Sequence, residues 1–166
     1  MEKNAGSDFV ITRVFNAPRD TVWRAWTERE QLMQWFGPKG YTMPLASLDF
    51  RPGGIFHYAL RAPDGAEIRG KWVFKEIVTP HKLVMISSFS DAQGGVTRHP
   101  MAPVWPLELL STTTLEEQDG KTALTIHWAP QHASELEIKA FKEGHGSIQQ
   151  GWGGTLDQLT AWLAAN

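Results

Sequence analysis

The chain has 166 residues, a formal net charge of −2, no cysteine and many aromatic residues, among them eight Trp and eight Phe. A chain of this length is expected to form one domain with a sizeable core. The absence of cysteine excludes disulfides and thiolate metal sites, and the lack of a basic run argues against a nucleic-acid partner.

The N-terminus is polar and lacks the apolar core of a signal peptide. No apolar segment approaches the roughly 18 residues that a membrane span needs. The sequence therefore predicts a cytoplasmic protein that has no membrane partner. Residues 1–7 are predicted to form a polar tail, and residues 8–166 a single domain.

The first predicted elements are a strand and two short helices. Residues 8–15 alternate in polarity and are rich in β-branched and aromatic side chains, which predicts a strand. Two short segments with apolar residues at helical spacing follow, and each carries tryptophan. Pro18 is typical of the first turn of a helix. Thr27 and Glu30 have the spacing of a capping box for the second helix, which should end at Gly37.

The middle of the chain is rich in strand patterns separated by turn residues such as Pro-Asp-Gly and Gln-Asp-Gly. Short turns between neighbouring strands predict an antiparallel meander, and the Gln-Asp-Gly turn predicts a hairpin. The six predicted strands cover residues 41–50, 55–60, 67–77, 83–89, 107–117 and 121–128.

Residues 90–106 break the pattern of strands joined by short turns. They show neither a helical nor a strand period and contain three prolines. A loop this long is uncommon in a compact domain and is often functional, so we expect a lid or an interface. The alternative is a mobile loop that has no function. Met101, Val104 and Trp105 favour a partly buried loop, because a fully solvated loop seldom needs them.

The chain ends in two predicted helices. Ser134 and Glu137 form a capping box for the first, and the second starts near Ser147 with apolar residues at helical spacing. Its interior glycines disfavour a helix by about 1 kcal/mol each, so they need a reason. We expect the side that carries Gly151 and Gly154 to press against the sheet or a neighbouring loop.

The element order predicts an α+β fold. A curved antiparallel sheet has one apolar face to cover, and the final helix is long enough to cross it. The two short helices after the first strand would close one end. Such an arrangement often leaves a hollow between the sheet and the long helix.

Four segments together resemble a known superfamily: NAPRDTVWRAWTEREQLMQWFGPKGY, DFRPGGIFHYALRAPDG, PHKLV and GWGGTLDQLTAWL. The chain is similar, from about Phe9 to Leu163, to START-like (helix-grip, SRPBCC) proteins. Within them it resembles the branch of activators of a heat-shock chaperone's ATPase, which includes polyketide cyclase-like bacterial proteins. The resemblance implies a helix-grip fold with a deep apolar cavity between the sheet and the C-terminal helix.

Large aromatic side chains line cavities for apolar or ring-shaped ligands as well as filling cores. The alternative for each residue is simple core packing. The predicted cavity residues are Trp26, Trp35, Phe56, Tyr58, Trp72, Phe74, Phe89, Trp105, Trp152 and Leu156.

Motifs for catalysis are largely absent. The sequence has no phosphate-binding loop, no dinucleotide fingerprint and no nucleophile elbow, and its six histidines lack metal-ligand spacing. It therefore predicts no cofactor and no metal. His57 and His127 are weak candidates for acid–base catalysis. Strand alternation places them opposite the aromatic faces, so a half-exposed position on the outer side of the sheet is favoured.

The leading hypothesis is a module that binds a small apolar or aromatic ligand, and it is not expected to be an enzyme. The alternative is a cyclase- or aromatase-like enzyme that uses the same cavity. A minor alternative is an interaction domain that binds a chaperone or forms a homodimer, which is the commonest soluble assembly.

Overall fold

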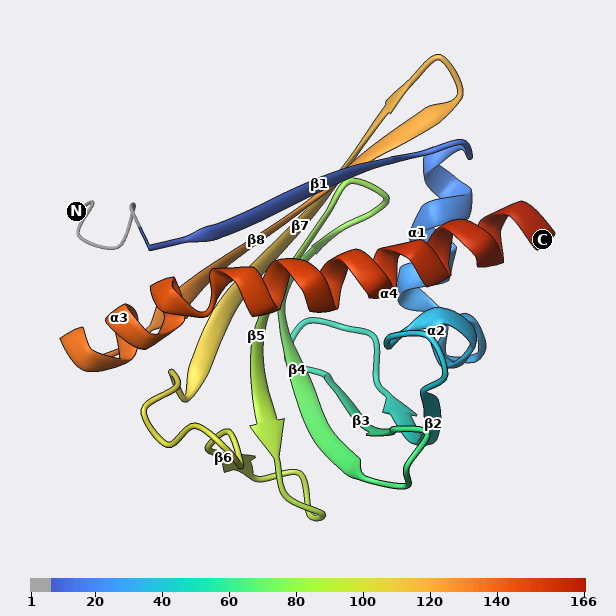
Figure 1. Ribbon diagram of the computed structural model, residues 1–166. Coiled ribbons are helices and arrows are strands. Elements are labelled where there is room, and N and C mark those ends of the chain that lie inside the picture. The colour runs from blue at the N-terminus through green and yellow to red at the C-terminus, as the bar shows by residue number, and fades with distance from the viewer. Residues whose placement is uncertain (1–6) are drawn as a thin grey trace.

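The computed structural model describes residues 7–166. Its long strands alternate buried and partly exposed side chains, so the sheet has one apolar face. Figure 1 shows this sheet curving around one long helix. The elements are β1 (Phe9–Phe15), α1 (Arg19–Thr27), α2 (Arg29–Trp35), β2 (Thr42–Leu48), β3 (Ile55–Arg61), β4 (Glu67–Val78), β5 (Lys82–Ser90), β6 (Val96–Thr97), β7 (Glu108–Gln118), β8 (Lys121–Gln131), α3 (Glu135–Glu143) and α4 (His145–Ala165).

The strands pair antiparallel in the order β1-β8-β7-β5-β4-β3-β2, and the short β6 pairs with β5. The sheet is unclosed, since β1 and β2 lie at its two edges. The predicted α+β class and the curved sheet around a long C-terminal helix are confirmed. Only β6 had no counterpart in the sequence pattern, because a two-residue strand is too short to show a period.

The β7–β8 hairpin has the turn that its sequence predicts. Asp119 and Gly120 form a two-residue loop, and their φ angles of 56° and 78° are those of a type I′ turn. This turn twists in the sense of the flanking strands, which is why Asp-Gly favours it. The hairpin in turn fixes the register of the longest pair of strands in the sheet.

One predicted capping box is confirmed and the other is wrong. Ser134 Oγ accepts a hydrogen bond from the Glu137 backbone N–H, and the Glu137 carboxylate accepts one from the Ser134 N–H. At α2 the N-cap is Glu28, and its side chain makes no capping bond. Thr27 is still the last residue of α1, and its hydroxyl donates to the Trp23 carbonyl instead, at 2.8 Å.

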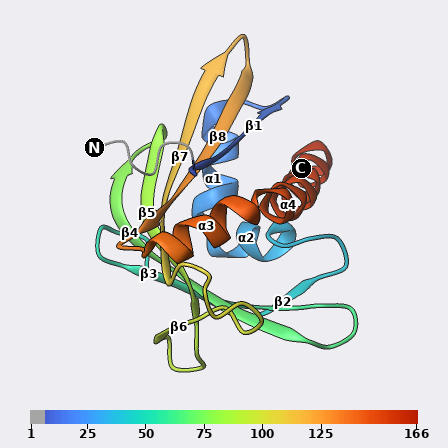
Figure 2. The same ribbon diagram turned by 60° about the vertical axis from the view of Figure 1, so that its left-hand side comes forward.

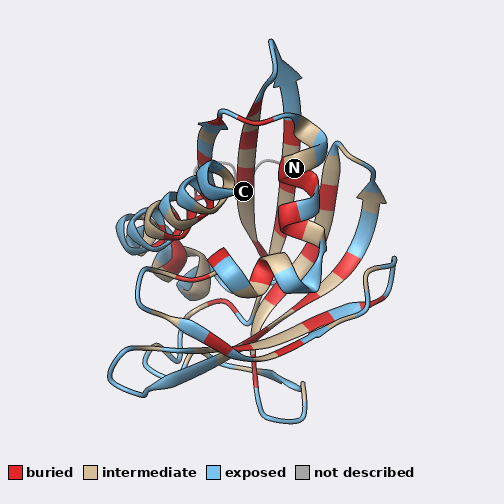
Figure 3. Ribbon diagram, turned by 90° about the vertical axis from the view of Figure 1, so that its right-hand side faces the viewer, coloured by how far each residue is buried: buried red, intermediate tan, exposed pale blue. Residues whose placement is uncertain are grey.

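A tryptophan stack joins the sheet to α4. The Trp26 ring from α1 is stacked with Trp72 of β4 and with Trp152 of α4, with centroid distances of 6.1 and 5.8 Å. Trp35 of α2 also packs against Trp26, at a tilted angle, and its indole N–H donates to the Ala25 carbonyl at 2.9 Å. The buried residues in Figure 3 gather on the inner side of the sheet and on the facing sides of the helices. The two short helices therefore close one end of the fold with aromatic side chains.

The interior glycines of α4 are not pressed against the sheet or a loop, although the Gly153 carbonyl accepts a hydrogen bond from the Arg13 side chain of β1 at 3.4 Å. A Cβ atom added at Gly151, Gly153 or Gly154 would meet no heavy atom within 4 Å. The prediction that the Gly151 and Gly154 side is pressed against its surroundings is therefore wrong. The helix also begins at His145, before the predicted start near Ser147.

Part of the predicted N-terminal tail lies outside the described residues, which begin at Ser7. Ser7 itself is buried, and its carbonyl accepts a hydrogen bond from His145 Nε2 at 2.6 Å. Within residues 7–166, no helix has both the length and the apolar character needed to cross a bilayer.

A pair of substitutions in α4 tests this packing. Leu156 is fully buried, so Leu156→Ala should lower the free energy of unfolding by about 2–5 kcal/mol. Gly154→Ala should raise it by up to about 1 kcal/mol, because the added methyl group meets open space and improves helix propensity. Urea denaturation measures both. A large loss for Gly154→Ala would mean that this side of α4 is crowded after all.

Candidate ligand cavity

A cavity of about 480 Å³ lies between the first half of α4 and the concave face of the sheet. Its walls come from α4, from β3, β4, β5, β7 and β8, and from the loop between β6 and β7. Figure 1 shows why the cavity lies there. The helices α1 and α2 lie beside the C-terminal end of α4, whereas α3 and the β6–β7 loop lie near its N-terminal end. Trp152, the member of the tryptophan stack that α4 supplies, lies in the first half of the helix, and the residues of α4 that line the cavity end at Thr155.

Small residues on α4 keep the cavity open. The helix presents Ser147, Gly151 and Thr155 to the cavity at successive turns, and Gly144, its N-cap, also lines the cavity. Larger side chains at these three helical positions would project into the cavity. Gly151 therefore has a physical reason, although the reason is open space and not close packing.

Aromatic rings supply much of the wall, and half of the predicted cavity residues are among them. Trp128 of β8 and Phe36, just after α2, also line the cavity, although the sequence analysis did not include them. The predicted residues on the wall are Tyr58, Trp72, Phe89, Trp105 and Trp152. Their contact with a ligand stays a prediction.

The other five predicted residues are placed in the core and do not line the cavity. Each is at most 2% exposed and packs among other side chains. They are Trp26, Trp35, Phe56, Phe74 and Leu156. Periodicity correctly identified which face of each element points inward. It did not show where along that face the packed core ends and the cavity begins.

Tyr58 lines the cavity and lies over a glycine of the neighbouring strand. Gly70 is its cross-strand partner on β4, and a Cβ atom added at Gly70 would lie only 2.6 Å from Tyr58 Cζ. The glycine therefore lets the ring lie flat across the strand. Burial raises the pKa of Tyr58 above its ordinary value, so the side chain is a neutral phenol.

His99 is the histidine that the sequence analysis did not consider for the cavity. It follows β6 in the loop and lines the cavity beside Phe89, with ring centroids 4.8 Å apart. Its Nδ1 accepts a hydrogen bond from the Met101 backbone N–H at 2.9 Å. Burial lowers the pKa of His99, so the neutral imidazole is favoured with its proton on Nε2. The only sequence signal was its place in an apolar loop.

Side chains of the loop contact α3, and Figure 2 shows the segment around β6 on the side of the molecule where α3 lies. Arg98 forms an ion pair with Glu137 and donates a hydrogen bond to the Trp105 carbonyl at 3.2 Å. Trp105 packs against Phe141, and its ring occupies the space that a side chain at Gly144 would need. Whether the loop opens as a lid or forms an interface stays a prediction.

The ion pair anchors the loop to the capped start of α3. A hydrogen bond from the Ser134 backbone N–H, followed by one from Arg98, holds the pKa of Glu137 below its usual range. Glu137 thus serves both the capping box and the loop contact. This end of the cavity is tied to helix α3 by a charged group that is ionised at neutral pH.

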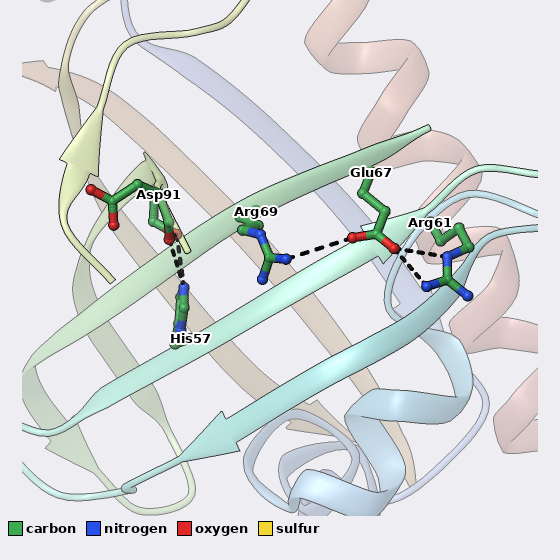
Figure 4. Close-up of polar contacts among 6 residues, drawn as sticks. His57, Arg61, Glu67, Arg69 and Asp91 are labelled. Carbon is green, nitrogen blue, oxygen red and sulfur yellow. Dashed lines mark hydrogen bonds and ion pairs between the residues drawn. The ribbon is translucent and has the colours of Figure 1, made fainter. Parts of the chain in front are cut away.

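Neither predicted catalytic histidine reaches the cavity. His57 lies on the outer face of the sheet, where Nε2 is 2.9 Å from Ser90 Oγ and 3.3 Å from the Asp91 carbonyl (Figure 4). His127 is 2.9 Å from an Asp8 carboxylate oxygen on β8's outer side. The sequence alternation anticipated this placement, and a catalytic role for either stays a prediction.

The same outer face carries a charged cluster. Glu67 binds Arg61 at 2.6 Å and lies 3.7 Å from Arg69, as Figure 4 shows. Arg69 borders the cavity, but its guanidinium is directed toward Glu67 on this outer side. Across residues 7–166, no three His, Asp or Glu side chains come together in a group that could hold a metal ion.

Comparison with known proteins agrees with this architecture. The family model described as activator of Hsp90 ATPase homolog 1-like protein matches residues 16–164. A crystal structure of a Mycobacterium smegmatis protein has a TM-score of 0.79 and 25% identity, covering 100% of this chain and 96% of that one. A solution structure of an Arthrobacter aurescens protein has a TM-score of 0.80 and 25% identity, covering 100% and 91%.

A crystal structure of a Nitrosomonas europaea protein shares the fold with a TM-score of 0.74 and 24% identity, covering 97% of this chain and 96% of that one. No curated protein matches the chain significantly. The resemblance to START-like proteins that the sequence predicted is confirmed, and with it the fold.

The contact between Tyr58 and Gly70 predicts a stability effect. Gly70→Ala should lower the free energy of unfolding by about 1–3 kcal/mol, because the new methyl group overlaps the tyrosine ring. The same change in a Tyr58→Leu background should cost much less, since the overlap is removed. Thermal or urea unfolding of the four proteins measures the coupling. Equal losses in both backgrounds would contradict the contact.

The environment of His99 predicts an acid-shifted titration. An NMR titration should place its pKa below the ordinary value of about 6.5. The unfolded chain then binds the proton at higher pH than the folded chain, so this residue's contribution to stability falls as the pH drops below about 6.5. A midpoint at or above 6.5 would show that the ring is solvated and does not belong to the cavity wall.

Proposed function

We propose that this protein, which belongs to the family of activator of Hsp90 ATPase homolog 1-like proteins, binds a small apolar or aromatic ligand in the cavity between its sheet and α4. The observation that carries the proposal is a hollow of about 480 Å³ with aromatic walls, beside a core of fully buried side chains. Ligand pockets typically measure about 300–1,000 Å³ and have mainly apolar walls.

The placement of the small residues supports the same function. Gly151 leaves open space on the cavity side of α4, although alanine at this helical position would favour the helix. A protein that needed only a packed core would gain stability by filling this space. A cavity kept at the expense of stability is expected where a ligand occupies it.

An enzyme of the cyclase or aromatase kind stays the alternative. Its acid–base group would be His99 or the Tyr58 phenol, because His57 and His127 lie on the outer face of the sheet. Chaperone binding, which the family description names, and homodimerisation are minor alternatives that no feature of residues 7–166 specifically favours. A cytoplasmic location also stays a prediction from the sequence.

Binding of the uncharged dye Nile red tests the proposal. Its fluorescence should rise on mixing with the protein, and Gly151→Leu should reduce the affinity at least tenfold because the leucine fills the cavity. Fluorescence titration measures the dissociation constant, and a melting curve confirms that each variant is folded.

Gly153→Leu is the matched control. It makes the same change two residues away, also in open space, but it does not line the cavity. Its dye affinity should therefore equal that of the unchanged protein. No dye binding by the unchanged protein, or equal losses for the two leucine variants, would rule out ligand binding at this site.

A further inference from the structure

The polar groups of the cavity wall indicate what kind of ligand it accepts. Besides His99, the polar residues with hydroxyl groups on the wall are Tyr58, Ser87, Ser88, Ser147 and Thr155. The hydroxyl groups of these five residues make no hydrogen bond to another residue of the described part of the chain. Charge is nearly absent, because Arg69 turns its guanidinium toward Glu67 on the outer face. An anionic ligand would therefore lose its hydration on entering the cavity without gaining a positively charged partner there, which is strongly unfavourable.

The Tyr58 hydroxyl is the most rigidly held of these groups. Its ring stacks on Phe56 at 5.0 Å and meets the edge of Phe36 at 5.2 Å. Gly70 lies directly beneath the tyrosine ring, so the ring has no room to move closer to the β4 backbone. Burial keeps the phenol protonated, so the group is a neutral donor at a fixed position.

His99 adds a second neutral donor elsewhere on the wall. Because Nδ1 accepts from the Met101 N–H, the hydrogen of the neutral ring is on Nε2. The wall thus combines aromatic surfaces with fixed hydrogen-bond donors. A ligand that matches both has flat rings and an oxygen that accepts hydrogen bonds.

We propose that the ligand is an uncharged ring compound with a carbonyl oxygen, and that the Tyr58 hydroxyl donates a hydrogen bond to that oxygen. This inference rests on the proposed function. A purely hydrocarbon ligand would leave the buried hydroxyl without a partner, whereas a ring ketone satisfies it. The difference should favour a ketone over its hydrocarbon analogue by about tenfold in affinity.

Two probes of nearly equal shape test this directly. 9-Fluorenone carries a carbonyl group where fluorene has a methylene group. Quenching of tryptophan fluorescence gives both dissociation constants for the unchanged protein, for Tyr58→Phe and for Tyr41→Phe. Tyr41 is the chain's only other tyrosine and does not line the cavity, so it is the matched control.

The unchanged protein and Tyr41→Phe should bind fluorenone about tenfold more tightly than fluorene. Tyr58→Phe should bind fluorene as before and lose most of the preference for the ketone. Equal binding of the two probes by the unchanged protein would overturn the inference and leave the proposed function standing. Retention of the preference by Tyr58→Phe would overturn the role of Tyr58. Failure of both probes to bind would overturn the inference together with the proposed function.

Discussion

The stacking of Trp26 on both Trp72 and Trp152 is the contact on which the rest of the structure depends, because it joins α1, the sheet and α4 through their rings. Large rings at this point hold the helix away from the sheet. Beyond the stack, toward the C-terminus, Leu156 and Leu159 fill the remaining space and the helix is part of an ordinary core. Before the stack, the small residues of α4 leave the space open, and the cavity is the result.

Trp152 belongs to both regions. It is one side of the stack, and it also forms part of the cavity wall beside Trp128, at a centroid distance of 5.9 Å. A molecule in the cavity would therefore contact the same ring that positions the helix. Binding would be coupled to the packing of the whole fold, since any ligand that stabilises this arrangement also stabilises the folded state.

Sequence reasoning could predict the fold because alternation and helical spacing report which face of each element is buried. The Asp119-Gly120 turn and the Ser134 cap were predictable for the same reason, since their chemistry is local. The candidate site was only half predictable. Trp72 and Phe74 share one face of β4, yet only Trp72 reaches the cavity, because the difference depends on what other elements place above each ring. The roles of Gly151 and His99 also arise from tertiary placement, which no local pattern contains.

The central claim is that the hollow under the first half of α4 is a binding site and not an unfilled part of the core. A crystal structure of the protein grown with fluorene tests it most directly. The account predicts density for the rings between Trp152 and Phe89, with the Trp26 stack unchanged. A structure in which side chains have collapsed into the hollow, with the probe absent or bound elsewhere, would contradict it.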